Sequence, residues 1–138
     1  MKMKLKRFEQ APQSSKKNKS HNIRIHSVGS VVMNMRLSER LGLSPGTGMS
    51  FHQDETEKKD GYLSIDKDSA NKVRLKTGTT TYLFNNVRLA EEILESVYPG
   101  KGVASVCFPV SAIPIEVEGI EGPVYAIITS VRLPDDED

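Results

Sequence analysis

The sequence predicts a mainly β protein with two short helices, an α+β fold in which duplicated strand-helix-hairpin units form one β-barrel. Residues 34–41 (NMRLSERL) recur with changes as residues 86–93 (NVRLAEEI). Each copy is followed by a Pro-Gly-x-Gly turn, at 45–48 and at 99–102, and is preceded by a basic, β-like run that ends in glycine. An internal repeat of this kind implies a two-fold arrangement inside one chain. Chance similarity between two small units is the alternative.

Length and charge divide the chain into a domain and two charged extensions. The chain has 138 residues, which is enough for one domain with its own core. We assign residues 22–133 to a single pseudo-two-fold domain, with repeat one at 22–68 and repeat two at 72–131. Basic side chains outnumber acidic ones in residues 1–21, which predicts a disordered basic arm, and residues 134–138 form an acidic tail.

Repeat one begins with an alternating strand. Ile23 and Ile25 alternate with Arg24 and His26, which predicts a strand with one face in water. The other strands of this repeat are expected at residues 30–33, 48–52 and 62–66, with a charged loop at 54–60.

The helix of repeat one has clear start and stop signals. Asn34 is expected to cap it, because an asparagine side chain can accept a hydrogen bond from an early helix amide. Leu37 and Leu41 lie one turn apart, so the charged residues around them face outward. Gly42 is expected to end the helix in the left-handed conformation.

Repeat two follows the same order with a longer helix. Asn86 is its expected cap, and the helix extends about two residues further than the first before Pro99 ends it. Cys107 lies in an apolar run and is expected to be a buried, inert thiol that forms no internal disulfide. The β candidates of this repeat are residues 72–78, 79–84, 103–108, 112–117 and 124–131.

Residues 39–46 (ERLGLSPG) combine a helix end, a Leu-Gly-Leu exit and a Pro-Gly turn before a hairpin. With the basic strand that ends at Gly29, this segment resembles the AbrB/MazE/SpoVT swapped-hairpin family. In that family two chains interleave into one small barrel. The resemblance therefore implies a single-chain, swapped-hairpin-like pseudo-dimer and a DNA-binding role. The chain departs from the family at Ser30, where a basic residue is usual, and at both helix caps, where proline is usual.

No residue pattern indicates catalysis. His21, His26 and His52 are scattered, and a single cysteine gives no spacing suited to zinc. The glycine turns do not open helices with the spacing of a phosphate-binding loop. Carboxylates gather in a loop and in the tail rather than around an apolar pocket. We therefore predict a non-enzymatic protein with no catalytic residues, no metal ligands and no cofactor.

Basic residues at equivalent positions of the two repeats are the candidate DNA contacts. An internal two-fold would present them as paired patches, as proteins do on two-fold sites in duplex DNA. Lysine and arginine would contact phosphates, and a bidentate arginine could recognise guanine. A solvated strand face is the alternative, and the match of Arg40 with Glu92 weakens the symmetry. The candidates are Lys16, Lys17, Lys19, Arg24, His26, Arg36, Arg40, Lys72, Arg74, Lys76 and Arg88.

The expected function is an AbrB-like transcriptional regulator in the cytoplasm, with double-stranded DNA as its partner and no membrane association. The chief alternative is a protein-interaction or structural module of a phage or mobile element, with a protein partner or self-association. The apolar, proline-interrupted segment at 107–120 motivates that alternative. A further alternative is an antitoxin-like binder whose disordered tail wraps a partner.

Overall fold

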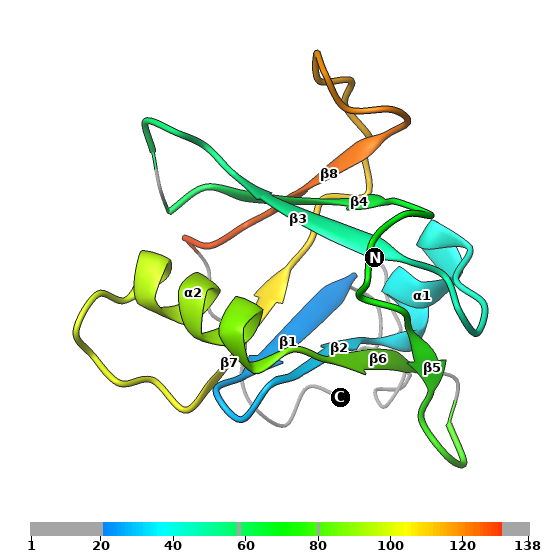
Figure 1. Cartoon of the computed structure of the whole chain (residues 1–138), viewed down its shortest axis with the longest axis horizontal. Coiled ribbons are helices and arrows are strands. Elements are labelled where there is room, and N and C mark those ends of the chain that lie inside the picture. The colour runs from blue at the N-terminus through cyan, green and yellow to red at the C-terminus, as the bar shows by residue number, and fades with distance from the viewer. Residues whose placement is uncertain (1–20, 58, 80, 131–138) are drawn as a thin grey trace, which may run out of the picture.

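The computed structural model describes residues 21–57, 59–79 and 81–130, which form two antiparallel sheets and two helices (Figure 1). The predicted class, mainly β with two helices, is confirmed. Within these ranges, no helix is long and apolar enough to cross a membrane. The predicted arm, apart from His21, and the acidic tail lie outside the described residues.

The larger sheet has five strands in the order β5-β6-β2-β1-β7, and every neighbouring pair is antiparallel. The turn between β1 and β2 needs a glycine, because Gly29 has a φ of 115°. The Gly29 carbonyl accepts a hydrogen bond from the Asn86 amide at 2.8 Å, so the turn is tied to the second helix. The strands are β1 (Asn22–His26), β2 (Ser30–Met33), β5 (Arg74–Leu75), β6 (Tyr82–Asn85) and β7 (Ser105–Pro109).

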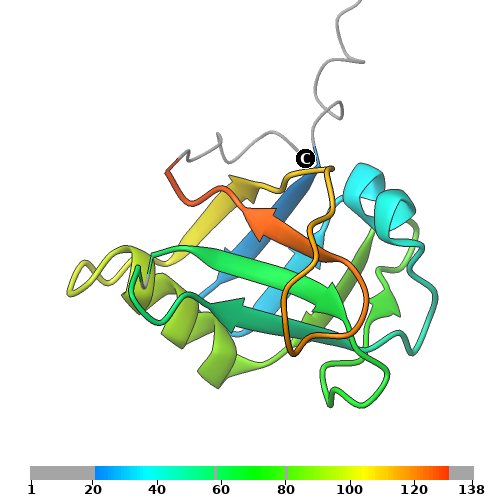
Figure 2. The ribbon, with the colours of Figure 1, turned by 90° about the horizontal axis from the view of Figure 1, so that it is seen from above.

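The smaller sheet consists of β3 (Met49–Gln53), β4 (Gly61–Ile65) and β8 (Val124–Ile127) in the order β3-β4-β8. It too is fully antiparallel. Seen from above, its strands lie across those of the larger sheet (Figure 2). The two sheets therefore form two layers with a common interior.

Apolar side chains from both sheets fill this interior. Burial of each large apolar side chain contributes about 1.5–3 kcal/mol, so the layers are held together mainly by the hydrophobic effect. The Phe51 and Phe84 rings meet across the layers with centroids 5.8 Å apart. The fully buried core members from β1, β2, β3, β4 and β7 are Ile23, Ile25, Val31, Met33, Met49, Leu63, Val106 and Phe108.

The two sheets do not close into the predicted barrel. Between their edges, the described residues make only isolated bridges, Gly48 with Lys72 and Val110 with Ile127. Two features explain the interruption. Strand β5 is only two residues long, and Pro109 at the end of β7 has no amide hydrogen to donate.

The order strand, strand, helix, strand, strand occurs twice along the chain. Pairing alternates between the two halves, since β2 pairs with β6, β1 with β7, and β4 with β8. The first half contributes the hairpins β1–β2 and β3–β4, whereas the second contributes the hairpin β5–β6 and the separate strands β7 and β8. The larger sheet therefore exists only when both halves are folded together.

Both helices begin at the predicted caps. In α1 (Met35–Leu41) the Asn34 side chain accepts from the Leu37 amide at 3.0 Å, and Gly42 ends the helix with a φ of 68°. In α2 (Val87–Val97) the Asn86 side chain accepts from the Leu89 amide, also at 3.0 Å. The second helix has 11 residues and the first has 7, so the excess is four residues rather than the predicted two.

The predicted wet face of β1 is wrong. The alternation correctly places Ile23 and Ile25 on the core side, but Asn22 and Arg24, on the opposite side, are only 1% and 8% exposed. Arg24 lies between Val32 of β2 and Cys107 of β7, both directly opposite it in the sheet. Alternation reveals which residues share a face, but it does not reveal whether that face is covered.

Several predicted strand boundaries also differ. Residues 112–117 do not form a strand, because Pro114 cannot donate and only Ile115 makes an isolated bridge, to Val124. The strand expected at 72–78 is reduced to β5. Cys107, by contrast, is buried and forms no disulfide, as predicted.

We expect Asn34→Ala to destabilise the protein more than the matched change Asn86→Ala. The Asn34 side chain is buried and accepts from two backbone amides, those of Leu37 and Asn22. Losing a cap costs about 1 kcal/mol, and a second buried amide left unpaired adds about 1–3 kcal/mol. Urea unfolding followed by circular dichroism measures both variants. An equal or smaller loss for Asn34→Ala would contradict the double role.

Candidate functional site

The predicted basic residues that the structure describes fall in three places rather than on one face. Lys16, Lys17 and Lys19 lie outside the described residues. One group is on the larger sheet, a second is on α1, and Arg88 is on α2. The two helices lie at opposite ends of the molecule (Figure 1). Arg36 and Arg88 are therefore not brought together.

Arg24 and Arg74 do share one face of the larger sheet. Arg74 lies opposite Leu83, Leu83 opposite Val32, and Val32 opposite Arg24, so all four occupy one row across the strands. The row spans three strand spacings, or about 14 Å between the two Cα atoms. Arg74 is exposed, whereas Arg24 is buried. Only Arg74 presents its side chain openly on this face.

Asn85 links Arg74 to Ser30. With its amide turned so that each atom meets a complementary partner, the Asn85 oxygen accepts from both Arg74 Nη atoms, at 3.0 and 3.1 Å. Its nitrogen then donates to the Ser30 hydroxyl at 3.2 Å. A guanidinium from the second half therefore lies next to Ser30, the position where the chain lacks the expected cation.

Two further candidates are engaged in structural contacts. The Lys72 ammonium donates to the Lys67 carbonyl at 2.7 Å and steadies the linker between the halves. Arg40 donates from Nε to the Ala112 carbonyl at 3.1 Å, and its guanidinium carbon lies 5.7 Å from the centre of the Tyr125 ring. This cation–π contact joins α1 to β8. Both side chains have roles that the fold alone explains.

The remaining candidates are partly or fully accessible. Arg36 and Lys76 are exposed, on α1 and in the turn after β5 respectively. His26, at the end of β1, is half-buried. Together with Arg74, Lys76 makes the β5 edge the most open basic part of the larger sheet.

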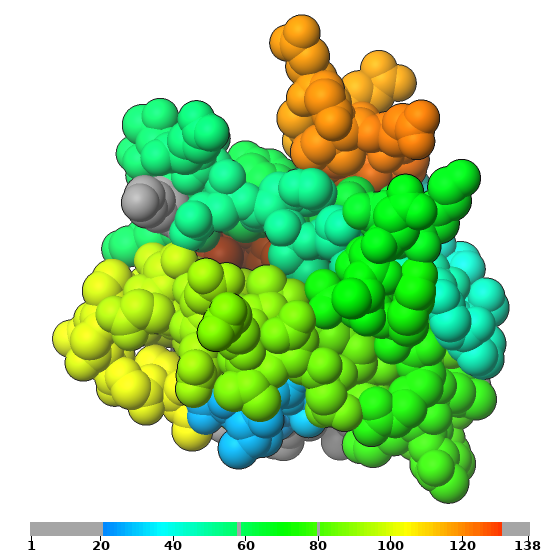
Figure 3. Space-filling view, viewed as in Figure 1, coloured from blue at the N-terminus to red at the C-terminus, as the bar shows by residue number. Residues whose placement is uncertain are grey.

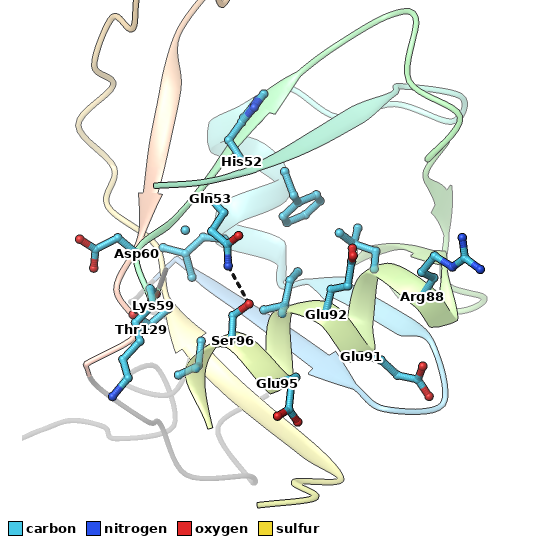
Figure 4. Close-up of a pocket in the computed structure, with 16 residues that line it drawn as sticks. His52, Gln53, Lys59, Asp60, Arg88, Glu91, Glu92, Glu95, Ser96 and Thr129 are labelled. Atoms are coloured by element: carbon cyan, nitrogen blue, oxygen red, sulfur yellow. Dashed lines mark hydrogen bonds between the residues drawn. The ribbon is translucent and has the colours of Figure 1, made fainter. Parts of the chain in front are cut away.

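A groove of about 490 Å³ separates α2 from the smaller sheet. Figure 3 shows the hollow between α2 and β3, with the segment after β8 at its bottom. Apolar side chains form the floor, and Glu92 points from α2 towards the sheet while Glu91 and Glu95 point away (Figure 4). The Gln53 amide donates to the Ser96 hydroxyl across one end at 2.7 Å. The apolar floor consists of Phe51, Leu89, Ile93, Val97 and Ile127.

The sequence did not predict this groove. Its walls come from β3, β8 and α2, which are far apart along the chain. The one indication in the sequence was the apolar face of α2, which is wider than packing against β1 and β2 requires. That signal cannot say where a helix face is left uncovered.

The connection between β7 and β8 exposes apolar side chains. Ile113 is 74% exposed, Ile115 41% and Val117 37%. Glu116 and Glu118 alternate with them and are exposed too. This projecting segment is the apolar patch that the interaction-module alternative anticipates.

His21 provides a pH test of the α1 surroundings. Burial, and then the positive charges of Arg36 and Arg40, lower the pKa of His21 below its usual value. A lowered folded-state pKa means that the unfolded chain binds more protons below about pH 6.5, so stability should fall as the pH drops through that range. Titration of the histidine ring protons by NMR measures the pKa directly. Arg36→Gln should raise it, and an unchanged value would refute the charge contribution.

Among the described residues, no group of three or more His, Cys, Asp or Glu side chains is placed to hold a metal ion. Comparisons with protein-family models, with curated proteins and with solved structures found no match. The function must therefore be argued from the pairing of the halves and from the placement of charge.

Proposed function

We propose that this chain is a non-enzymatic, DNA-binding transcriptional regulator of AbrB-like type. The observation that carries the proposal is the alternation of hairpins, in which the β1–β2 hairpin lies between β6 and β7 of the other half. Interleaving of this kind is what the resemblance implies for two chains of that family. Here one chain would supply both halves, as an internal duplication would produce.

The charge pattern on the larger sheet supports the DNA partner. Arg74 and Lys76 form an exposed cationic edge, and Asn85 holds the Arg74 guanidinium beside Ser30. In this proposal Arg74, Lys76 and Arg36 contact phosphates. Lys72 and Arg40 keep the structural roles described above.

We expect salt-dependent binding to duplex DNA that depends on the β5 edge. Each phosphate contact contributes about 0.9 to the slope of log K against log salt concentration. The double change Arg74→Ala with Lys76→Ala should lower the slope by roughly 2 and weaken binding by roughly tenfold at about 0.1 M salt. Fluorescence anisotropy with a labelled duplex measures both quantities.

The matched control removes two lysines elsewhere, Lys59→Ala with Lys101→Ala. These residues are exposed in loops away from the β5 edge. The control should leave the slope nearly unchanged although the net charge changes equally. Absence of binding by the unaltered chain even at low salt would overturn the proposal.

A second candidate function is a protein-interaction module of a phage or mobile element. The exposure of Ile113, Ile115 and Val117 favours it, because isolated globular proteins rarely display such a projecting apolar row. Ile113→Ser with Ile115→Ser should then abolish partner capture or self-association, as measured by pull-down and light scattering. If the unaltered chain and the double variant are both monomers that capture no partner, this alternative is wrong.

A further inference from the structure

We propose that the groove between α2 and the smaller sheet binds the chain's own basic segment, residues 2–8. The proposal rests on the chemistry of the groove, the sequence of the segment and the place where the arm joins the domain. It is independent of the DNA-binding proposal, since the groove and the β5 edge use different residues.

The groove offers an apolar floor and an inward carboxylate. Phe51, Leu89 and Ile93 are only partly buried, so the floor keeps apolar area in contact with water. Glu92 points across the groove towards the sheet (Figure 4). A ligand that presents large apolar side chains together with a cation would cover the floor and neutralise the carboxylate.

Residues 2–8 have this chemistry. Within this segment, residues 2–6 (KMKLK) alternate lysine with apolar residues, and in an extended segment alternate side chains face opposite sides. Met3 and Leu5 share one side and would cover the floor, while the lysines on the other side reach the rim. The 11 residues of α2 span about 16 Å, which corresponds to about five residues of extended chain.

The arm joins the domain at His21, beside Arg36 and Arg40 of α1, and a chain of strand contacts leads from there to the rim of the groove. The His21 carbonyl accepts from the Val110 amide at 2.7 Å, and the Pro109 carbonyl accepts from the Ile128 amide at 2.9 Å. Thr129, the next residue, lines the groove. His21 and Thr129 are therefore separated by two strand spacings and two residue steps, or at most about 17 Å. The twelve residues 9–20 can span about 40 Å, so reach is not limiting.

The space between α1 and the smaller sheet is comparable to the groove at α2, but there a side chain of the helix fills it. There Arg40 reaches from α1 towards the smaller sheet, bonds the Ala112 carbonyl and stacks over Tyr125. On α2 the repeat places Glu92 instead of a cation, and Phe51 is the aromatic ring in the groove. A lysine or arginine delivered from residues 2–8 would supply the missing cation between Glu92 and Phe51.

The other charges around the groove favour a cationic segment overall. Asp60, Glu91 and Glu95 add to Glu92, against Lys59 and Arg88. His52 is engaged with the Ser64 hydroxyl at 3.0 Å. Four acids against two bases leave a net negative rim at neutral pH, and salt should weaken the attraction.

The test is a single tryptophan placed in the segment of the full chain. The protein contains no tryptophan, so Leu5→Trp gives a reporter without background. Its emission should be blue-shifted and protected from iodide quenching, relative to a free peptide of residues 1–10 with the same change. Glu92→Lys in the same chain should return the emission and quenching to the values of the free peptide. One molar salt should act in the same direction.

The matched control is Glu39→Lys, which reverses an exposed acid on α1 and should leave the emission blue-shifted. Circular dichroism confirms that each variant is folded. Peptide-like emission in the unaltered groove would overturn the proposal. So would a blue shift that survives Glu92→Lys, since the segment would then lie elsewhere. A shift that appears only as protein concentration rises would assign the groove to a second copy and also refute binding within one chain.

Discussion

The antiparallel pairing of β2 with β6 is the interaction on which the rest of the structure depends. It joins the two halves at the centre of the larger sheet, with Val31 opposite Phe84 and both side chains in the core. Each strand leads directly into a helix through an asparagine cap. Because the strands are antiparallel, the helices begin at opposite ends of the pair. The separation of α1 from α2, and so of Arg36 from Arg88, follows from this one contact.

Opposite placement gives the two helices different surroundings, and their side chains contact the smaller sheet differently. At α1, Arg40 bridges to the β7–β8 connection and to Tyr125, which fixes the helix against the smaller sheet. At α2, Glu92 faces the smaller sheet, and the Gln53–Ser96 hydrogen bond crosses the gap. Side-chain contacts therefore hold α1 against the smaller sheet, whereas a groove separates α2 from it. The two sides differ in the side chains that face the smaller sheet and in the length of the helix, which is 7 residues for α1 and 11 for α2.

The parts of the fold that could be predicted depend on neighbours in the sequence. The caps at Asn34 and Asn86 and the left-handed end at Gly42 follow from the local chemistry of asparagine and glycine. The burial of Arg24, the open groove and the incomplete closure of the sheets depend on contacts between distant parts of the chain. Periodicity shows that Arg24 points away from Ile23. Periodicity does not show which residues cover the side of the strand that carries Arg24.

The two halves resemble each other more in their cap and apolar residues than in their charged residues. Core and cap positions must satisfy packing and backbone hydrogen bonds in both halves, so a substitution there costs stability. A surface cation can instead be supplied from a neighbouring strand. Arg74 does this for Ser30 through Asn85, from the other half of the molecule. The surface around Ser30 therefore carries a positive charge although Ser30 itself has none. Aligning the two halves by sequence does not show where the basic residues lie on the surface.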